Sequence, residues 1–542
     1  MTGIGRTSVD EARFGPAVLL FGFLLVATVV VRSFDPDSFN HDVAWILYVA
    51  AEMLDGSILY VDIVEENPPL VFWLSVPVVA VARVLGCAPI LVLNLAVATG
   101  IGLAAWLAYR ILRSVRPEGP AIHALSVVGL LVAFEVLGSG YEYGQRDNLF
   151  VIAVFPYVFA AAARLEGRLL DPRLALAAGL LAGLGIALKP FFLAFWLVVE
   201  LFLFFSSPSQ WKRLENLCIA GTNVGYAILV LVFAPSYLEM IGIASEVYDA
   251  YGNFGSPILL FKPEVGVFLF AIALFGVVRA TEADRSVRRL LLVAAAGFLV
   301  VALLQGKGWD YHYDPLGLAS GLLIAVILLG VVFRADSLGG LFRASSATLA
   351  LLVWVALDAA AAVGLAFGAW PVVGPGAQRR TFVKELTQVA RDHGRGRPVW
   401  FLSTSIVPAF PVVNLSGAGW SSRYCCLWMI PGLYPPEERF SRPFPYRDRA
   451  EMGELEKSLL DAVVEDLEND PPALLFVDRS PDKQAFRHSD FDFLSYFLRD
   501  PRFARIFKAY EDLGSVGPYR VYKRGFSGVG IPSTAGEIGS GR

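Results

Sequence analysis

The chain alternates between long apolar stretches and short polar clusters. Stretches long enough to cross a hydrocarbon core of roughly 30 Å recur through the first two thirds of the sequence. We expect membrane-spanning helices at 16–31, 88–110, 122–139, 148–164, 174–189, 190–206, 217–234, 264–279, 290–304, 315–333 and 347–371. This pattern predicts a polytopic α-helical membrane protein with about 11 spans.

The composition supports a membrane protein. Hydrophobic residues make up 56% of the chain, charged residues only 17%, and the mean hydropathy is +0.58, all outside the range of soluble globular proteins. The net charge of -4 is divided among the loops and a polar C-terminal region. No basic patch typical of nucleic-acid binding is present in the sequence, so the lipid bilayer is an expected partner and nucleic acid is not.

Lysine and arginine gather in every second loop, which places those loops on the cytoplasmic side. The basic groups are Arg6/Arg13, Arg110/Arg113/Arg116, Arg164/Arg168/Arg173, Lys212/Arg213, Arg279/Arg285/Arg288/Arg289 and Arg334/Arg343. The loops between them are acidic or carry one isolated cation: 32–66, 140–147, the turn at Lys189, 235–263 and 305–314. We therefore expect the loops that lack basic clusters on the outer face of the membrane.

The stretch 67–86 does not fit this alternation, because counting it as a span would place the later basic loops outside. Three prolines are expected to interrupt helical geometry there: Pro68, Pro69 and Pro77. Arg83 would also be costly at membrane depth. We expect a segment that enters and leaves on the outer face. An outside N-terminus with a true span here, which would move Asp42 to the cytoplasm, remains an alternative.

The C-terminal region changes in character. We expect residues 1–371 to form the membrane module, with a first outer loop at 32–87, and 372–524 to form an extracytoplasmic α/β domain. Within that domain the pattern predicts strands at 398–403 and 473–478, helices at 383–393 and 455–468, and a hairpin at 510–523. The tail at 525–542 is rich in glycine and serine and is expected to be disordered.

The first outer loop carries the most chemistry. Apolar residues recur at helical spacing after Asp42: Val43, Ile46, Leu47, Ala50, Met53 and Leu54. This predicts an amphipathic helix, too short to span, that lies along the interface and holds Asp42 near the lipid headgroups. A carboxylate there could act on a substrate delivered by lipid. The alternative is that Asn40 or Asp42 only caps the helix.

The same loop contains two adjacent carboxylates, Glu65 and Glu66, followed by Asn67 and two prolines. A fixed anionic site of this kind could bind a divalent cation. A solvated acidic turn is the alternative, and no cofactor is firmly expected.

Charged residues also stand at the ends of later spans. Arg146 could pair bidentately with a phosphate while Asp147 supplies a second carboxylate, although the two could also form a local ion pair. Lys189 lies between two apolar stretches. It could contact a phosphate, or it could be a helix-end lysine whose ammonium reaches the membrane interface.

The loop after residue 304 combines one cation, an imidazole and aromatic faces: Lys307, Trp309, Tyr311, His312 and Tyr313. This mixture is suited to contacts with phosphate and to stacking on sugars. The alternative is an ordinary aromatic belt at the membrane interface.

The order of these motifs resembles the GT-C membrane glycosyltransferases, in the branch related to bacterial protein O-mannosyltransferases and to the aminoarabinose transferases that act on lipid A. The resemblance covers roughly residues 15–335 and lies in Asp42, Ala51–Gly56, Asn67–Leu74, Arg146–Phe150, Gly183–Lys189 and Lys307–Pro315. Two positions depart from it. Val43 follows Asp42 where relatives often carry Glu, and Asn67 stands where they often carry Lys, so one phosphate contact is expected to be supplied differently.

The resemblance implies an inverting transferase. It would move a sugar from a polyprenyl-phosphate donor to the hydroxyl of a glycan, lipid or protein acceptor outside the cytoplasm. It implies that Asp42 is the general base, assisted by Asp147. The donor phosphate would contact Arg146, Lys189, Lys307, His312 and Asn67; the substrate would contact Trp309, Tyr311 and Tyr313; and Glu65 and Glu66 would be the ligands of any divalent metal ion.

A transporter or a flippase for lipid-linked sugars is the alternative function. Transporters commonly show repeated halves and charges near the middle of the bilayer. In this chain the ionisable residues gather at one predicted face and no matching halves are visible, which favours the transferase.

Overall fold

The computed structural model describes residues 19, 21–115, 121–208, 212–252, 256–280, 284–332, 375–481 and 483–525. The chain divides into two compact units. The first comprises Met1–Thr381, Ile406–Asn414 and Arg423–Cys425, and the second comprises Phe382–Ser405, Leu415–Ser422 and Cys426–Arg542.

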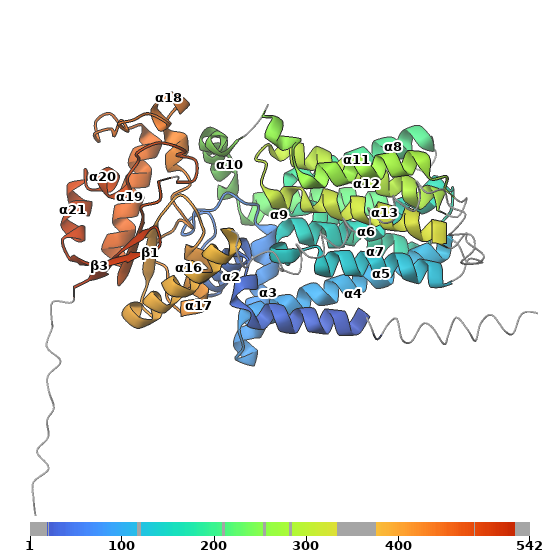
Figure 1. The fold of residues 1–542 in the computed structure, drawn as a ribbon, viewed down its shortest axis with the longest axis horizontal. Helices are drawn as coiled ribbons and strands as arrows, with labels where there is room; N and C mark the ends of the chain where they lie inside the picture. The colour runs from blue at the N-terminus through green and yellow to red at the C-terminus, as the bar shows by residue number, and fades with distance from the viewer. Residues whose placement is uncertain are drawn as a thin grey trace, which may run out of the picture. The chain divides into compact units, whose positions relative to one another are not determined.

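The first unit is a bundle of helices that lie side by side (Figure 1). After a helix at Phe21–Phe34, the long helices are α4 (Pro89–Val115), α5 (Ala121–Leu137), α6 (Arg146–Leu165), α7 (Pro172–Ala187), α8 (Leu193–Ser206), α9 (Leu214–Phe233), α11 (Pro263–Val277), α12 (Arg285–Gln305) and α13 (Asp314–Val332). α6 packs against α4, α7 and α12 and is buried on nearly all sides. It therefore forms the centre of the bundle.

Every expected span that falls within the described residues coincides with one of these helices, which confirms the helical membrane fold. Five helices in the described ranges are long and apolar enough to cross a membrane by length and composition, and further apolar helices are shorter. The expected span at 347–371 lies outside the described residues, as does nearly all of the expected tail. The number of spans therefore stays a prediction.

Shorter elements lie between the long helices. They are η1 (Pro36–Ser38), α2 (His41–Leu54), α3 (Leu70–Leu85), η2 (Gly140–Glu142), η3 (Pro190–Phe192), α10 (Ser236–Val247), η5 (Tyr248–Tyr251), η6 (Pro257–Leu259) and η7 (Asp310–His312). The predicted helix after Asp42 is confirmed as α2, whose first half is buried from Val43 to Leu47. It packs against α3.

The proline-rich stretch is more regular than expected. Pro68 and Pro69 precede α3, and Pro77 lies inside it without ending it. The prediction that Pro77 interrupts the helix is wrong, because a proline removes one hydrogen bond while tertiary packing holds the remaining turns. Arg83 donates to both carboxylate oxygens of Asp55 at 2.7 Å. Whether α3 crosses the membrane stays a prediction.

The second unit contains a four-stranded sheet in the order β1-β2-β4-β3. The strands are β1 (Val399–Leu402), β2 (Leu474–Asp478), β3 (Tyr510–Val516) and β4 (Tyr519–Arg524). β1 and β2 are parallel and the other pairs are antiparallel. The predicted strands and hairpin are confirmed, and Gly517 supplies the positive φ of 54° that the tight turn requires.

Helices accompany the sheet in sequence. They are α16 (Pro375–Val389), η8 (Ala390–Gly394), α17 (Ala409–Ser416), η9 (Ile430–Leu433), α18 (Pro436–Arg439), α19 (Glu454–Asn469), α20 (Phe493–Phe497) and α21 (Pro501–Phe507). The part of α16 up to Thr381 and the part of α17 up to Asn414 belong to the first unit. The sheet core is aromatic, with Phe401 stacked on Phe476 at 4.2 Å between ring centroids. The expected C-terminal α/β fold is therefore present.

Candidate active site

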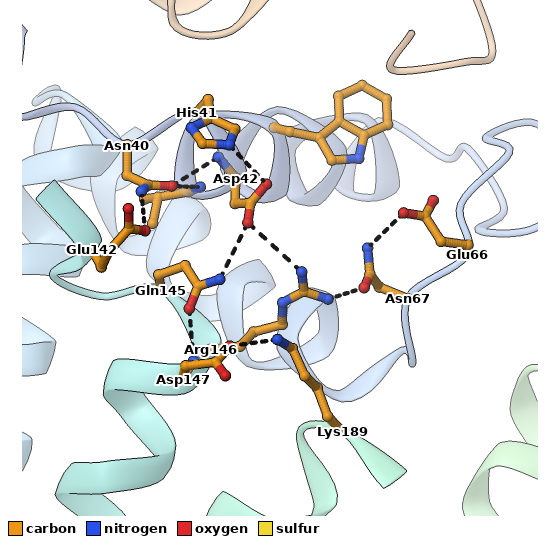
Figure 2. Close-up of polar contacts among 12 residues, drawn as sticks. Asn40, His41, Asp42, Glu66, Asn67, Glu142, Gln145, Arg146, Asp147 and Lys189 are labelled. Atoms are coloured by element: carbon orange, nitrogen blue, oxygen red, sulfur yellow. Dashed lines mark hydrogen bonds and ion pairs between the residues drawn. The ribbon is translucent and has the colours of Figure 1, made fainter. Parts of the chain in front are cut away.

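Five of the predicted polar residues from separate segments converge at one end of the helix bundle, which we call the site end (Figure 2). They are Asp42, Asn67, Arg146, Asp147 and Lys189. The start of α6 and the ends of α7 and α12 meet here, because Lys189 contacts both Asp147 and Gln305. Residues more than a hundred positions apart in sequence thus share one cluster.

Asp42 lies in the first turn of α2, but Asn40 is the residue that caps the helix. The Asn40 Oδ1 accepts hydrogen bonds from the backbone N–H groups of Asp42 at 2.8 Å and Val43 at 3.3 Å. The capping alternative therefore applies to Asn40. The Asp42 carboxylate is left to contact other side chains.

Three groups surround that carboxylate. Gln145 Nε2 donates to Asp42 Oδ2 at 3.2 Å, Arg146 Nη2 lies 3.8 Å from the same oxygen, and His41 Nε2 lies 3.6 Å from Oδ1. Burial by itself raises the pKa of Asp42, but His41, Arg146 and Gln145 together outweigh it and the pKa lies below its usual value. Asp42 is therefore ionised at neutral pH.

Gln145 was not predicted as a site residue. Its Oε1 accepts from the backbone N–H of Asp147 at 2.7 Å, so it caps α6 while its amide nitrogen holds Asp42. A single glutamine before an apolar run gives no chemical signal in the sequence.

Arg146 is buried at the first position of α6, with 5% of its surface exposed. Its Nη1 donates to Asn67 Oδ1. Its Nε has no hydrogen-bond partner among the described residues. A buried guanidinium with an unused donor is poised to accept a further anionic ligand.

Glu65, one of the two expected metal ligands, already has hydrogen-bond partners. Both oxygens of Glu65 already accept hydrogen bonds, Oε2 from Trp45 Nε1 at 2.5 Å and Oε1 from the backbone and side chain of Asn67 at 2.8 and 2.5 Å. In the part of the chain that the structure describes, no three His, Cys, Asp or Glu residues gather to hold a metal ion. A divalent cation at this turn therefore stays a prediction, and Glu65 would have to give up existing hydrogen bonds to hold it.

The protonation of this turn is also unusual. Burial, and then the neighbouring Glu66, raises the pKa of Glu65 to about 8, against the opposing hydrogen bonds from Trp45 and Asn67. Burial likewise raises the pKa of Glu66. The two carboxyl groups together carry less negative charge at neutral pH than the sequence suggests.

Lys189 donates to Asp147 Oδ2 and lies 3.4 Å from Gln305 Oε1. Asp147 Oδ1 and Gln305 Nε2 are buried and have no partner among the described residues. Two glycines set the position of Lys189. A Cβ on Gly185 would lie 2.5 Å from Ala153 Cβ, and one on Gly183 would lie 2.7 Å from a carbon of α9. Small residues thus bring α7 close to both neighbouring helices.

Lys307 lies against aromatic rings. Its Nζ is 3.3 Å from the ring centroid of Tyr248 and 4.5 Å from that of Trp309. Burial lowers the pKa of Lys307 to about 7, an effect that Glu66 partly offsets. Tyr248 was not predicted, yet its hydroxyl donates to Glu66 Oε1 at 2.9 Å. One tyrosine in a long loop carries no sequence signal.

His312 and Tyr313 differ from their predicted roles. Burial and then the cations Lys189 and Lys307 hold the pKa of His312 well below its usual value, so His312 is neutral and supplies no positive charge for phosphate. Tyr313 is fully buried and donates to the carbonyl of Leu259 at 2.8 Å, so it anchors the η6 turn instead of facing a substrate.

Tyr311 and Trp309 remain in the cluster. The Tyr311 ring centroid lies 5.1 Å from Lys189 Nζ, and the ring meets that of His312 edge-on at 4.4 Å. The Trp309 ring lies 5.8 Å from that of Tyr311. The site end therefore combines three cations, at least one ionised carboxylate and aromatic faces.

Comparison with known proteins adds one finding. No protein-family model matches the chain, and no curated protein matches it. Among solved structures the chain is similar to the crystal structure of ArnT from Cupriavidus metallidurans bound to undecaprenyl phosphate, with a TM-score of 0.52 and 14% sequence identity. The likeness covers 93% of this chain and 97% of that chain. The likeness shows that the two chains share a fold.

Proposed function

We propose that this protein is an inverting glycosyltransferase that moves a sugar from a polyprenyl-phosphate donor to an acceptor hydroxyl outside the cytoplasm. The observation that carries the proposal is the buried Arg146 guanidinium 3.8 Å from Asp42, whose Nε has no hydrogen-bond partner among the described residues. The Lys189 ammonium lies in the same cluster, where it contacts Asp147 and Gln305. A free donor and a second cation close to a carboxylate suit a phosphate adjoining a general base. The ArnT-like fold supports a lipid phosphate as the ligand.

The donor phosphate would bind Arg146 and Lys189, with Lys307 and Asn67 close by. As the bond between the sugar and the phosphate oxygen breaks, negative charge develops on that oxygen. Fixed cations in a water-poor site stabilise this charge and so lower the barrier. The leaving group is the polyprenyl phosphate, which remains in the lipid.

Asp42 would act as the general base. The acceptor oxygen attacks the anomeric carbon from the side opposite the phosphate, its proton passes to Asp42, and the configuration of the sugar inverts. Asp147 would keep Lys189 in place through their ion pair. Trp309 and Tyr311 would stack on the sugar.

Donor binding would also strengthen the base. In the free protein Arg146 helps to lower the pKa of Asp42. A phosphate bound to Arg146 would offset that positive charge, so Asp42 would hold a proton more tightly only after the donor has arrived. The donor would therefore have to bind before Asp42 can take the acceptor's proton.

The domain assignment belongs to the same proposal. Residues 1–371 would form the catalytic membrane module of an inner-membrane enzyme, and 372–524 an extracytoplasmic domain. The acceptor would be a glycan, a lipid or a protein. The panel of donors described next identifies the sugar.

The test is reconstitution of the full chain in nanodiscs with a panel of radiolabelled polyprenyl-phosphate sugars and a membrane extract as acceptor source. We expect one donor to be consumed by the wild type and not by Asp42→Asn. A flippase would instead move the donor between leaflets of a vesicle and would do so equally well with Asp42→Asn. That result would replace the transferase by the alternative function.

A further inference from the structure

A chain of hydrogen bonds leads from α2 to Arg146, which lies beside Asp42. Two of its members, Trp45 and Glu65, have no role in the proposed mechanism. Trp45 lies one turn after Asp42 and is 4% exposed. Its indole Nε1 donates to Glu65 Oε2 at 2.5 Å. Glu65 Oε1 accepts from the Asn67 side-chain nitrogen, also at 2.5 Å. The Asn67 Oδ1 then accepts from Arg146 Nη1.

The orientation of the Asn67 amide decides what Arg146 meets. An amide presents an acceptor on one side and two donors on the other. Because Glu65 holds the nitrogen side, the oxygen side faces the guanidinium. If the amide turned over, two donors would oppose each other and Arg146 would lose this contact.

Glu65 depends on Trp45 in turn. Glu65 is 1% exposed, and its carboxyl group is held from two sides, at Oε1 by the backbone N–H of Asn67 and at Oε2 by the indole N–H. Loss of the indole N–H would leave Oε2 unheld and the group free to rotate. The indole itself is held edge-on by Phe410, with 4.9 Å between ring centroids. Asn414 Nδ2 donates to the carbonyl of Ala44 at 3.0 Å beside it.

We propose that Trp45 and Glu65 are positioning residues for the donor phosphate. They lock the Asn67 amide so that its oxygen holds the Arg146 guanidinium beside Asp42, with the Nε of Arg146 directed to the ligand. Glu65, which the sequence offers as a metal ligand, would thus help to hold the Arg146 guanidinium. The inference rests on the proposed function, since it takes the ligand to be a polyprenyl phosphate.

The experiment measures binding of undecaprenyl phosphate to the full chain in nanodiscs. We expect Trp45→Phe, which keeps an aromatic ring against Phe410 but removes the N–H donor, to weaken binding about tenfold, equivalent to about 1.4 kcal/mol. Asn67→Ala should weaken binding to a similar extent. Trp73→Phe is the matched control, because the Trp73 ring packs edge-on against Tyr226, with 6.2 Å between ring centroids.

The double variant separates positioning from a general loss of packing. If Trp45 acts through Asn67, then Trp45→Phe/Asn67→Ala binds no more weakly than Asn67→Ala alone, because residues in one network are not additive. Wild-type binding by Trp45→Phe, or two penalties that multiply in the double variant, would overturn the inference.

A second variant covers the case in which Trp45→Phe does not elute as a folded protein in size-exclusion chromatography. Glu65→Gln keeps the side-chain volume but sets an amide nitrogen against one of the existing donors. The same cycle with Asn67→Ala then gives the same decision. If the wild type binds undecaprenyl phosphate no better than undecaprenol, the proposed function fails and this inference with it. If the wild type prefers undecaprenyl phosphate and the variants bind it equally well, the inference fails and the proposed function stands.

Discussion

The central helix α6 carries a buried arginine at each end, and their surroundings differ. Near its end, Arg164 donates from Nη1 and Nη2 to the two oxygens of Glu200 at 2.6 and 2.8 Å, and its Nε lies 3.6 Å from Glu215 Oε1. All three nitrogens face carboxylates. At the start of the helix, Arg146 has the Asn67 oxygen, Asp42 at 3.8 Å and an Nε with no partner in the described ranges.

This difference separates a structural charge from one that awaits a ligand. Both side chains are almost completely buried, with 1% of Arg164 and 5% of Arg146 exposed. Burying a charge is costly unless it is paired and hydrogen-bonded, and the Arg164 cluster meets that condition within the protein. The Arg146 cluster meets it only in part, which is typical of sites that bind charged substrates.

Replacing Asp42 by Asn should have the largest effect. The change removes the proposed base without changing the shape of the side chain, so transfer should fall by roughly 10²–10⁴-fold. Binding of undecaprenyl phosphate should persist, because the cations remain. Rates of sugar transfer and equilibrium binding measured on the same preparation check both parts.

The control for this variant is Asp310→Asn, because Asp310 is an exposed partner of Lys262 and should be replaceable without loss. If Asp42→Asn transferred the sugar at a rate within about tenfold of the wild type, Asp42 would not be the general base.

Arg164→Ala tests the structural half of the comparison. The variant leaves the buried Glu215 and the partly buried Glu200 without their cation, which should cost about 3–5 kcal/mol of stability. The thermal midpoint in detergent should fall, whereas undecaprenyl phosphate affinity of the remaining folded protein should not change. Arg168→Ala, which removes a half-exposed side chain 3.5 Å from Glu166, is the control and should change stability little. A large loss of affinity in Arg164→Ala would erase the distinction between the two ends.

Arg146→Lys sharpens the distinction by keeping the charge and removing the fork. A lysine cannot bind the Asn67 oxygen and a phosphate with separate, fixed nitrogens, so affinity for the donor should fall about tenfold, or about 1.4 kcal/mol. Stability should change much less than in Arg164→Ala. Isothermal titration and thermal unfolding of the same preparation compare the loss of donor affinity with the loss of stability. Equal losses of stability in both variants would mean that Arg146 is structural.

The smallest effect should come from pH. The pKa of Lys307 is lowered to about 7, so its ammonium is charged below that pH and loses its proton above it. Affinity for a polyprenyl-phosphate sugar, whose phosphodiester keeps one charge throughout, should therefore decrease a few-fold from pH 6 to pH 8. Lys307→Arg stays charged over this range and should flatten the profile. A wild-type affinity that rises with pH would show that Lys307 does not act on the phosphate.

The membrane helices, the helix α2 and the strands of the second unit were predictable because each depends on a local pattern. Apolar residues at helical spacing predict α2. Glycine and proline between two strand-like stretches predict the hairpin of β3 and β4. Asp42, Arg146 and Lys189 were visible as candidates because an ionisable group beside a long apolar stretch is costly and needs a reason.

The remaining site residues depend on contacts between distant segments. Trp45, Gln145 and Tyr248 belong to residue types that serve equally well in a core, a cap or a loop, so nothing local marked them. The hydrogen bonds at the expected metal ligands were hidden for the same reason. Adjacent carboxylates at positions 65 and 66 reveal their charge in the sequence, but not the indole and amide donors that meet them in space.

The sequence alone thus determined that the chain is a helical membrane protein with a C-terminal α/β fold, and where its costly charges lie, since both follow from hydrophobic periodicity. Only the tertiary structure decided which charges are satisfied. The partners of Arg146 and Arg164 come from other helices and loops, and hydrogen bonds of a few ångströms exist only after packing has brought those segments together.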